Sequence, residues 1–330
     1  MDLLLAILFL VGGFVLLIKG ADMFVDGSSN IAKLLKVPSI IIGLTVVALG
    51  TSLPEASVSI SSALAGQNAL AISNVVGSNI FNTLVVLGAS ALIVPVCVQP
   101  DSVKKEIPFS IVCTFALLAS LILGVGTAVS AESGEEITTY TLGRIGGAVL
   151  LALFAFYMYW QISAALKARR AGELEEEDDG KKISPIKSLL FIVIGVAFII
   201  LGGNLVVRGA STIAEKLGMS QTLIGMTIVA VGTSLPELVT SMVAAKKGES
   251  DLALGNAIGS NIFNIVFILG SSALISPMTV DILAIIDTIA VIAISALVLA
   301  FSATGKKISR AEGGIMVASY IAYLVYMCVR

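Results

Sequence analysis

The stretch that decides the fold is GLTVVALGTSLPE, from Gly43 to Glu55, which returns as GMTIVAVGTSLPE from Gly225 to Glu237. The offset between the two copies is 182 residues. The same offset, without a gap, carries GSNIFN from 77–82 onto 259–264. Chance does not produce two ungapped matches of this length at one spacing, so the chain contains an internal duplication.

Long apolar runs surround both copies of the motif. The 330 residues are 57% hydrophobic and 13% charged, whereas soluble domains are about 25% charged. We therefore predict an all-α, polytopic membrane protein, because helices satisfy their own backbone hydrogen bonds in lipid. About ten spans of near 20 residues are expected, with cores at 3–33, 38–65, 68–94, 107–127, 142–166, 187–214, 220–245, 252–276, 282–303 and 309–328.

The duplication divides these spans into two five-helix repeats, at 1–166 and 187–330. Five is an odd number, so the second repeat enters the membrane from the opposite side. Inverted-topology repeats of this kind are typical of secondary transporters, whose substrate site lies near the bilayer midplane. The segment 167–186 between the repeats contains the acidic run 173–179, for which a solvated flexible linker is a better interpretation than a cation-sensing patch.

The basic residues predict the orientation. Fifteen of the twenty Lys and Arg residues fall in alternate breaks between spans, and such loops are cytoplasmic. The linker is then cytoplasmic and both termini are extracytoplasmic. We expect a multi-pass protein of a bacterial or archaeal plasma membrane.

Glu55 and Glu237 each lie in the middle of an apolar span. A charge at the bilayer centre costs between roughly 3 and more than 10 kcal/mol, and packing gives no reason to accept that cost twice at equivalent positions. The alternative is a buried acid that stays protonated or pairs with Lys19 or Arg208 of the first helix of either repeat. The duplication favours a functional site.

The neighbours of the two glutamates add oxygen atoms. Pro54 and Pro236 lack an N–H group, so each opens a helical turn and frees backbone carbonyls, which membranes tolerate only beside protein or a cavity. Thr51, Ser52 and Glu55 share one helix face. On the next span Ser78 and Asn82 share a face, and their counterparts are Ser260 and Asn264.

This is an all-oxygen set in a chain without histidine, which suits hard cations such as Ca2+, Mg2+, Na+ or K+. Two carboxylates neutralise one divalent ion. Flexible, mixed oxygen ligands favour Ca2+ over Mg2+, which demands octahedral geometry. The motif alone leaves the identity of the ion open.

The two GTSLPE and two GSNIFN motifs resemble the alpha-1 and alpha-2 repeats of the cation/calcium exchanger superfamily, here 43–88 and 225–270, and within it the prokaryotic sodium/calcium antiporters. The resemblance extends over essentially the whole chain. It implies a secondary active antiporter that exchanges Na+ for Ca2+ by alternating access, electrogenically, and that exports Ca2+. It implies no cofactor besides the transported ions. It also implies that the first helix of each repeat is a long gating helix that slides across the bundle.

The resemblance also implies a ligand set. Glu55 and Glu237 would bracket Ca2+ together with the carbonyls of Thr51 and Thr233. Overlapping Na+ sites would use Ala48, Ser52, Ser78, Ala230, Ser234 and Ser260, with Asn82 and Asn264 as polar lining. Some members, including many K+-dependent ones, have Asp in place of Asn264, so we expect exchange that does not depend on K+.

An H+/Ca2+ or other cation exchanger is the main alternative, although the intact GTSLPE resembles the Na+-using branch. We expect no enzyme, because the chain has no HExxH, no paired-Asp signature and no nucleophile–His pair. A structural scaffold does not need duplicated carboxylates in lipid. The net charge of -2 gives no sign of nucleic-acid binding, so the expected partners are Ca2+, Na+ and the lipid bilayer, with the chain acting as a monomer or a homo-oligomer.

Overall fold

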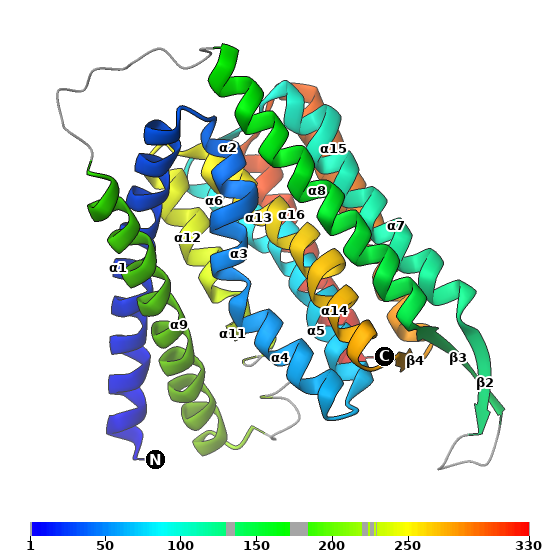
Figure 1. Cartoon of the computed structure of the whole chain (residues 1–330). Coiled ribbons are helices and arrows are strands. Elements are labelled where there is room, and N and C mark those ends of the chain that lie inside the picture. The colour runs from blue at the N-terminus through cyan, green and yellow to red at the C-terminus, as the bar shows by residue number, and fades with distance from the viewer. Residues whose placement is uncertain are drawn as a thin grey trace.

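The computed structural model describes residues 2–129, 136–171, 184–219, 224, 228 and 230–329. Within these ranges the chain is a bundle of long helices, and both termini lie at the same end of it (Figure 1). Seven helices are long and apolar enough to cross a membrane, or eight when one bent pair is counted as a span. All ten expected spans have a helical counterpart in the described residues, so the prediction of a polytopic helical protein is confirmed.

The helices follow the two repeats. The first contains α1 (Leu3–Leu35), α2 (Ser39–Ile42), η1 (Gly43–Val47), α3 (Ala48–Thr51), α4 (Leu53–Leu64), α5 (Asn68–Phe81), η2 (Asn82–Val86), α6 (Leu87–Ile93), η3 (Ser102–Glu106), α7 (Ile107–Leu123) and α8 (Arg144–Ala171), where η marks a π-helical turn. The second contains α9 (Pro185–Lys216), α11 (Ala230–Thr233), α12 (Leu235–Lys246), α13 (Ser250–Phe263), η5 (Asn264–Leu269), α14 (Gly270–Ile275), α15 (Ile282–Gly305) and α16 (Arg310–Val329).

Short strands form two small sheets between the helices, which was not predicted from the sequence. β2 (Val125–Val129), β3 (Glu136–Leu142) and β4 (Met278–Val280) form one antiparallel sheet, and β1 (Val96–Cys97) pairs with β5 (Lys307–Ile308). The expected span 107–127 is therefore wrong at its end, since α7 stops at Leu123. Short apolar runs do not distinguish strand from helix, and the β-branched and aromatic residues of β3 favour a strand.

The expected span 38–65 is a broken helix. Its two halves, Ser39–Thr51 and Leu53–Leu64, meet at an angle of 51°. Ser52 lies between them with non-helical dihedral angles, directly before the first turn that contains Pro54. The kink is thus at the proline, where a missing N–H prevents a regular helix from continuing. Ser234 occupies the same position before Pro236.

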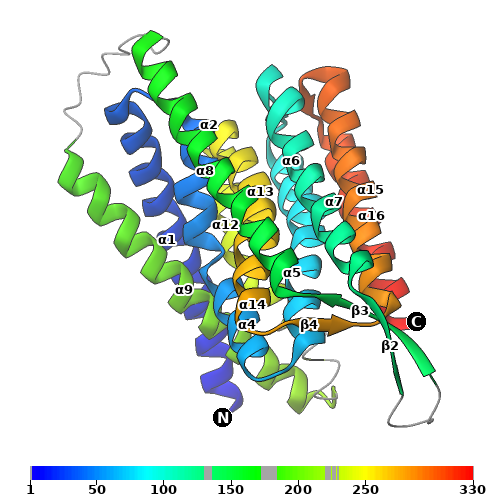
Figure 2. The same ribbon diagram turned by 45° about the vertical axis from the view of Figure 1, so that its right-hand side comes forward.

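The first helices of the two repeats, α1 and α9, lie side by side along one flank of the bundle and run in opposite directions (Figures 1 and 2). Glycines allow their backbones to approach closely. A Cβ atom at Gly20 would come within 2.8 Å of the carbonyl oxygen of Gly195, and one at Gly202 within 2.7 Å of that of Gly13. Small residues at a helix interface are the usual means of tight packing in lipid, so α1 and α9 form a closely packed pair.

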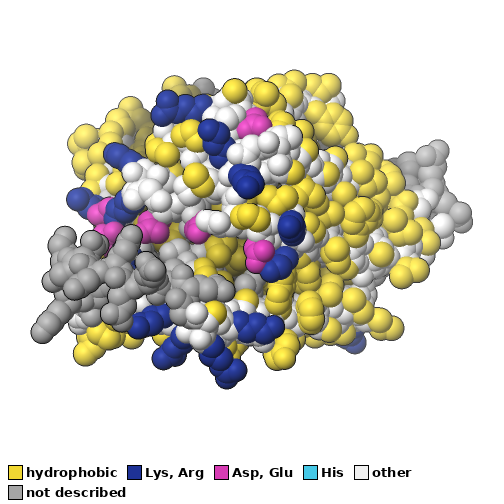
Figure 3. All heavy atoms as spheres, turned by 90° about the horizontal axis from the view of Figure 1, so that it is seen from above, with side chains coloured by type: hydrophobic (Ala, Val, Ile, Leu, Met, Phe, Trp, Pro, Cys, Tyr) yellow, Lys and Arg dark blue, Asp and Glu magenta, His cyan; other side chains and the backbone are white. Residues whose placement is uncertain are grey.

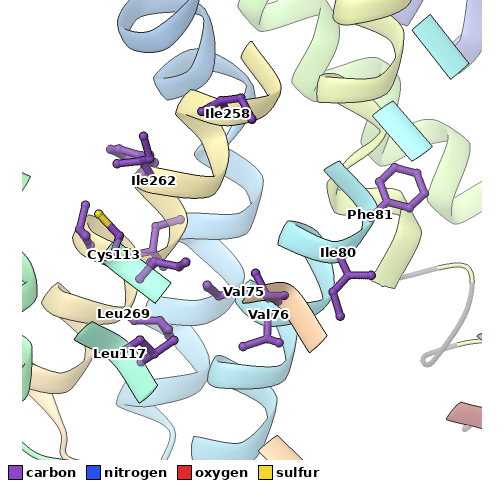
Figure 4. Close-up of a cluster of buried hydrophobic side chains, with 14 of the residues drawn as sticks. Val75, Val76, Ile80, Phe81, Cys113, Leu117, Ile258, Ile262 and Leu269 are labelled. Atoms are coloured by element: carbon purple, nitrogen blue, oxygen red, sulfur yellow. The ribbon is translucent and has the colours of Figure 1, made fainter. Parts of the chain in front are cut away.

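A large apolar core lies inside the bundle. Figure 4 shows side chains of α5, α7 and α13 packed together, among them Val75, Leu117 and Ile258. Many outward-facing side chains are apolar as well, such as Leu4 at 72% exposed. Water would not favour such a surface, whereas lipid does.

Lys and Arg side chains gather on the end of the bundle seen from above in Figure 3. The termini lie toward the opposite end (Figure 1), as the alternation of basic loops predicted. The acidic run 173–179 of the linker lies outside the described residues. Assignment of the basic end to the cytoplasm, and the repeat boundaries at 166 and 187, remain our proposals.

Candidate cation site

The two glutamates of the GTSLPE motifs are fully buried at the kinks of the broken helices, and each is bound by a serine of the other repeat. Ser52 Oγ donates to Glu237 Oε1 at 2.8 Å, and Ser234 Oγ donates to Glu55 Oε1 at 2.8 Å. All four residues are 0% exposed. The site is therefore built jointly by the two halves of the chain.

A second layer of oxygens surrounds this crossed pair. Ser260 Oγ lies 3.4 Å from Glu237 Oε1 and 3.5 Å from the carbonyl oxygen of Ala48. Thr51 and Thr233 contact Glu237 and Glu55, respectively. Hydroxyl, carbonyl and carboxylate oxygens thus lie close together around the two glutamates.

Several buried oxygens of the site have no hydrogen-bond donor among the described residues. These are the second carboxylate oxygens, Oε2, of Glu55 and Glu237, and the hydroxyl of Ser78. Leaving a buried polar group unsatisfied costs about 1–3 kcal/mol, and more for a charged one. A cation among these oxygens would remove that cost.

Pairing of the glutamates with basic residues finds no support. Lys19 and Arg208 are exposed to the outside of the bundle, whereas the partners of the carboxylates within the described residues are hydroxyl groups.

The GSNIFN motifs place their asparagines at the centre of the bundle, where α5 and α13 continue into the π-helical turns η2 and η5. Asn82 and Asn264 are both 0% exposed. Asn264 Nδ2 donates to Asn79 Oδ1 at 3.2 Å, whereas neither side-chain polar atom of Asn82 has a partner in the described structure. The two equivalent positions therefore differ in their surroundings.

The other expected ligands are placed as follows. Ala48 is buried, and Thr233 is half-buried at the end of α11. The backbone of Ala230 begins α11, but its side chain lies outside what the structure describes. Within the described residues, neither Ser78 nor Asn82 has a hydrogen bond to a glutamate. Both are buried, and both have side-chain polar atoms without a partner there.

Glycines bring the backbones of the two repeats together at the site. A Cβ atom at Gly259 would lie 2.7 Å from the carbonyl oxygen of Leu44 and 2.8 Å from Ala48 Cβ. Gly50, directly before Thr51, leaves room for the ring of Phe24 of α1. The helix pair α1–α9 is thus in contact with the kink that carries the site.

A cavity of about 370 Å3 opens between α4, α9 and the α11–α12 kink. Its lining includes Pro54 and Pro236 of the two motifs, together with Thr233, and Asn204 of α9. The cavity therefore reaches the edge of the site along the surface of α9.

Sequence reasoning missed two asparagines that support the site. Asn74 Nδ2 contacts the carbonyl oxygen of Glu55 and Ser59 Oγ, and Asn256 Nδ2 makes the equivalent contacts with Glu237 and Ser241. Both pairs obey the offset of 182 residues. The offset between the repeats was the sequence signal that could have identified Asn74 and Asn256.

Comparison with known proteins agrees with this geometry. The family described as sodium/calcium exchanger protein matches residues 5–163 and 187–329. The chain belongs to the sodium/calcium exchanger family. The sodium/calcium exchanger MaX1 of Methanosarcina acetivorans is 36% identical over 344 aligned positions, covering 97% of each chain, and the inner membrane protein YrbG of Escherichia coli is 33% identical over 86% of this chain and 83% of its own.

A solved structure of the sodium-calcium exchanger NCX_Mj, soaked with 10 mM Na+ and no Ca2+, superimposes with a TM-score of 0.81 at 32% identity. The match covers 98% of this chain and 99% of that one. As a member of the exchanger family, the protein is a cation/Ca2+ antiporter of the membrane. The expected family and function class are confirmed.

Proposed function

We propose that this exchanger couples the inward movement of Na+ to the export of Ca2+, electrogenically. The crossed pairing of Ser52 with Glu237 and of Ser234 with Glu55, at 2.8 Å each, carries the proposal. It supplies two carboxylates, each with one oxygen that has no donor in the described structure. Two negative charges balance one Ca2+ ion, and more than two Na+ ions per cycle would move net charge across the membrane.

The proposed ligands follow the sequence-based set. Glu55 and Glu237, with the carbonyls of Thr51 and Thr233, would hold Ca2+. The Na+ sites would use Ala48, Ser52, Ser78, Ala230, Ser234 and Ser260, with Asn82 and Asn264 lining them. Because Ser52, Ser234 and Ser260 lie against the carboxylates, Na+ and Ca2+ would compete for shared oxygens, and each ion would weaken binding of the other. This competition would couple the movement of Na+ to the movement of Ca2+.

Alternating access would come from the α1–α9 pair. The two helices pack closely on each other through glycines, and Phe24 of α1 contacts the kink at Gly50. A shift of the pair across the kinks would open the site to one end of the bundle and close it to the other. We place the basic end in the cytoplasm of a bacterial or archaeal cell and both termini outside.

The test uses purified protein in liposomes loaded with Na+ and diluted into Na+-free buffer that contains radiolabelled Ca2+. Ca2+ uptake should require the outward Na+ gradient and should be lost in Glu55→Gln and Glu237→Gln proteins. Asp101→Asn, which changes an exposed acid paired with Lys105, is the matched control and should transport normally. Na+-dependent uptake that survives both glutamate substitutions would refute the site.

The same liposomes distinguish Na+/Ca2+ exchange from the alternative, H+/Ca2+ exchange. An outward proton gradient without Na+ should drive little uptake, and equal uptake in that condition would identify an H+/Ca2+ exchanger instead. A membrane-potential dye reports the electrogenic step. Efflux of more than two Na+ for each Ca2+ taken up moves net positive charge out of the liposome, so an inside-positive potential clamped with valinomycin should speed Ca2+ uptake and an inside-negative potential should slow it. Uptake that is indifferent to the potential would overturn electrogenicity alone.

A further inference from the structure

Asn256 of α13 lies where the two repeats meet, yet none of the proposed ion ligands includes it. It is 0% exposed. Its Nδ2 donates to the main-chain oxygen of Glu237 at 3.3 Å and to Ser241 Oγ at 2.9 Å. Its Oδ1 accepts from Thr51 Oγ1 at 2.9 Å. One amide therefore contacts the glutamate helix of its own repeat and the broken helix of the other.

The orientation of this amide is fixed by its partners. Ser241 directs its own hydroxyl proton to the carbonyl oxygen of Ala253 at 3.3 Å, so its oxygen is free to accept from Asn256. Rotating the amide by half a turn would place Oδ1 against the carbonyl of Glu237, with no proton between two acceptors. The oxygen of the amide must face Thr51.

This orientation offers an acceptor to the hydroxyl proton of Thr51. A threonine hydroxyl has one proton. Besides the carboxylate of Glu237, which Thr51 contacts, three acceptors are within reach, namely Val47 O at 3.1 Å, Ala48 O at 3.3 Å and, nearest of the three, Asn256 Oδ1 at 2.9 Å.

When Asn256 takes the proton, the carbonyl of Ala48, one of the proposed Na+ ligands, loses the hydrogen bond from Thr51 and keeps those from Ser52 N at 3.1 Å and Ser260 Oγ at 3.5 Å. Asn256 therefore lowers the number of donors that compete with the transported ion for this oxygen.

The first repeat contains the donor contacts of this arrangement. Asn74 Nδ2 donates to the main-chain oxygen of Glu55 at 3.4 Å and to Ser59 Oγ at 2.9 Å. Asparagine is required at such a position because it alone offers two donors and an acceptor on so short a side chain; aspartate has no donor and glutamine is one methylene longer.

We propose that Asn256 is a positioning residue for exchange, which ties Glu237 to the Thr51 turn of the opposite repeat, and that Asn74 holds Glu55 in the equivalent way. Both halves of the chain then close on the ion together. This inference rests on the proposed Na+/Ca2+ exchange, and it concerns neighbours of the ligands, not the ligands themselves.

The experiment compares Asn256→Ala, Thr51→Val, Thr51→Ser and the double variant Thr51→Val/Asn256→Ala. Ser302→Ala serves as a control, because Ser302 is a buried serine in the last turns of α15, a helix that carries none of the proposed ligands. Two quantities are measured: the apparent KM for Ca2+ in liposome uptake, and the rise in Tm of the purified protein on adding Ca2+, which needs no transport.

Removing a residue that supports a metal ligand lowers affinity roughly 10–100-fold, and we expect that loss in Asn256→Ala and in Thr51→Val. Thr51→Ser keeps the hydroxyl and should restore affinity. The losses of the two single variants should be less than additive in the double variant, because the Thr51–Asn256 bond is removed in both. Ser302→Ala should match the parent in both measurements.

Parental Ca2+ affinity in Asn256→Ala, or additive losses in the double variant, would overturn the positioning role. If Asn256→Ala does not fold, Thr51→Val against Thr51→Ser decides the question, since equal affinities in that pair exclude a role for the hydroxyl–amide bond. If the parent shows no Na+-dependent uptake, the proposed function fails separately, and the Ca2+-induced rise in Tm still tests the positioning role.

Discussion

Ser52 of the first repeat donates a hydrogen bond to Glu237 of the second at 2.8 Å, and Ser234 of the second donates to Glu55 of the first at the same distance. Neither glutamate is therefore bound within its own repeat alone. An ion between the carboxylates would contact both halves of the chain. A movement of one half relative to the other would therefore change the ligands of that ion.

The first prediction concerns these two serines. Ser52→Ala and Ser234→Ala should each lower the apparent affinity for Na+ about tenfold, which corresponds to about 1.4 kcal/mol, because a buried carboxylate oxygen loses its donor. Ser52→Thr keeps a hydroxyl and should stay closer to the parent. The measurement is the Na+ dependence of Ca2+ uptake in liposomes. A large loss in one alanine variant with none in the other would contradict a symmetric site.

The second prediction concerns the close approach at Gly259. An added Cβ would lie 2.7 Å from the carbonyl oxygen of Leu44, so Gly259→Ala should push α13 away from α3 and separate Ser260 from Ala48. Overpacking of this kind costs about 1–3 kcal/mol, and we expect a lower Tm together with weakened Na+ and Ca2+ binding.

Gly12→Ala is the matched control for that substitution. Gly12 lies in α1 and an added Cβ meets nothing within 4 Å, while alanine favours a helix over glycine. Its Tm should equal or exceed that of the parent in the same detergent. A Gly259→Ala protein with parental Tm and transport would show that α13 has room to adjust.

The pairing of the proposed site residues could not be predicted from the sequence. Thr51, Ser52 and Glu55 share a helix face, which suggests that they act together, yet Ser52 binds the glutamate of the other repeat. Helix periodicity describes neighbours along one helix only. The crossed contact depends on how the repeats pack, and that packing depends on the glycines at the interface.

Asn74 and Asn256 were missed for a different reason. An isolated asparagine in a membrane helix is usually a contact between helices, and each is separated from its glutamate by 19 residues. The duplication marked them equally with the GSNIFN residues. What the sequence did not provide was the turn between the helices, which brings each asparagine beside the glutamate that precedes it.

A third prediction concerns an ion pair that the sequence could not show. Asp22 and Asp26 of α1 bind Lys247, at the end of α12, with Nζ–Oδ1 distances of 2.7 Å and 2.6 Å. The cluster joins the α1–α9 pair to the rest of the bundle at its basic end. Lys247→Ala should change the exchange rate by up to roughly fivefold, the effect of about 1 kcal/mol, and leave the apparent Ca2+ affinity unchanged.

The response of this ion pair to pH and salt gives a second check. Partial burial lowers the pKa of Lys247, but hydrogen bonds to Asp22 and Asp26 outweigh it and raise the pKa above the ordinary 10.5. Because this pKa is raised, the contact is stabilised at every pH at which Lys247 is protonated. The stabilisation is lost only in strongly alkaline solution, where Lys247 loses its proton. Between pH 6 and 9, roughly, the effect of Lys247→Ala should therefore be constant, while salt should diminish it. Lys246→Ala, with the same change of charge one residue earlier, is the control, and an equal effect there would contradict a specific contact.

The last prediction concerns Asn82 and Asn264, the last residues of the two GSNIFN motifs. Asn264 donates through Nδ2 to Asn79 Oδ1 at 3.2 Å, so Asn264→Asp would set a carboxylate against that oxygen, with two acceptors and no proton between them. A monovalent cation would relieve the contact, and Asn264→Asp should change the selectivity between Na+ and K+. Asn82→Asp adds the same charge at the equivalent position without removing a described hydrogen bond, and its effect on selectivity should be smaller. The measurement is Ca2+ uptake against Na+ at several K+ concentrations. Na+ and K+ dependence in Asn264→Asp identical to the parent would show that this position does not set the choice of monovalent ion.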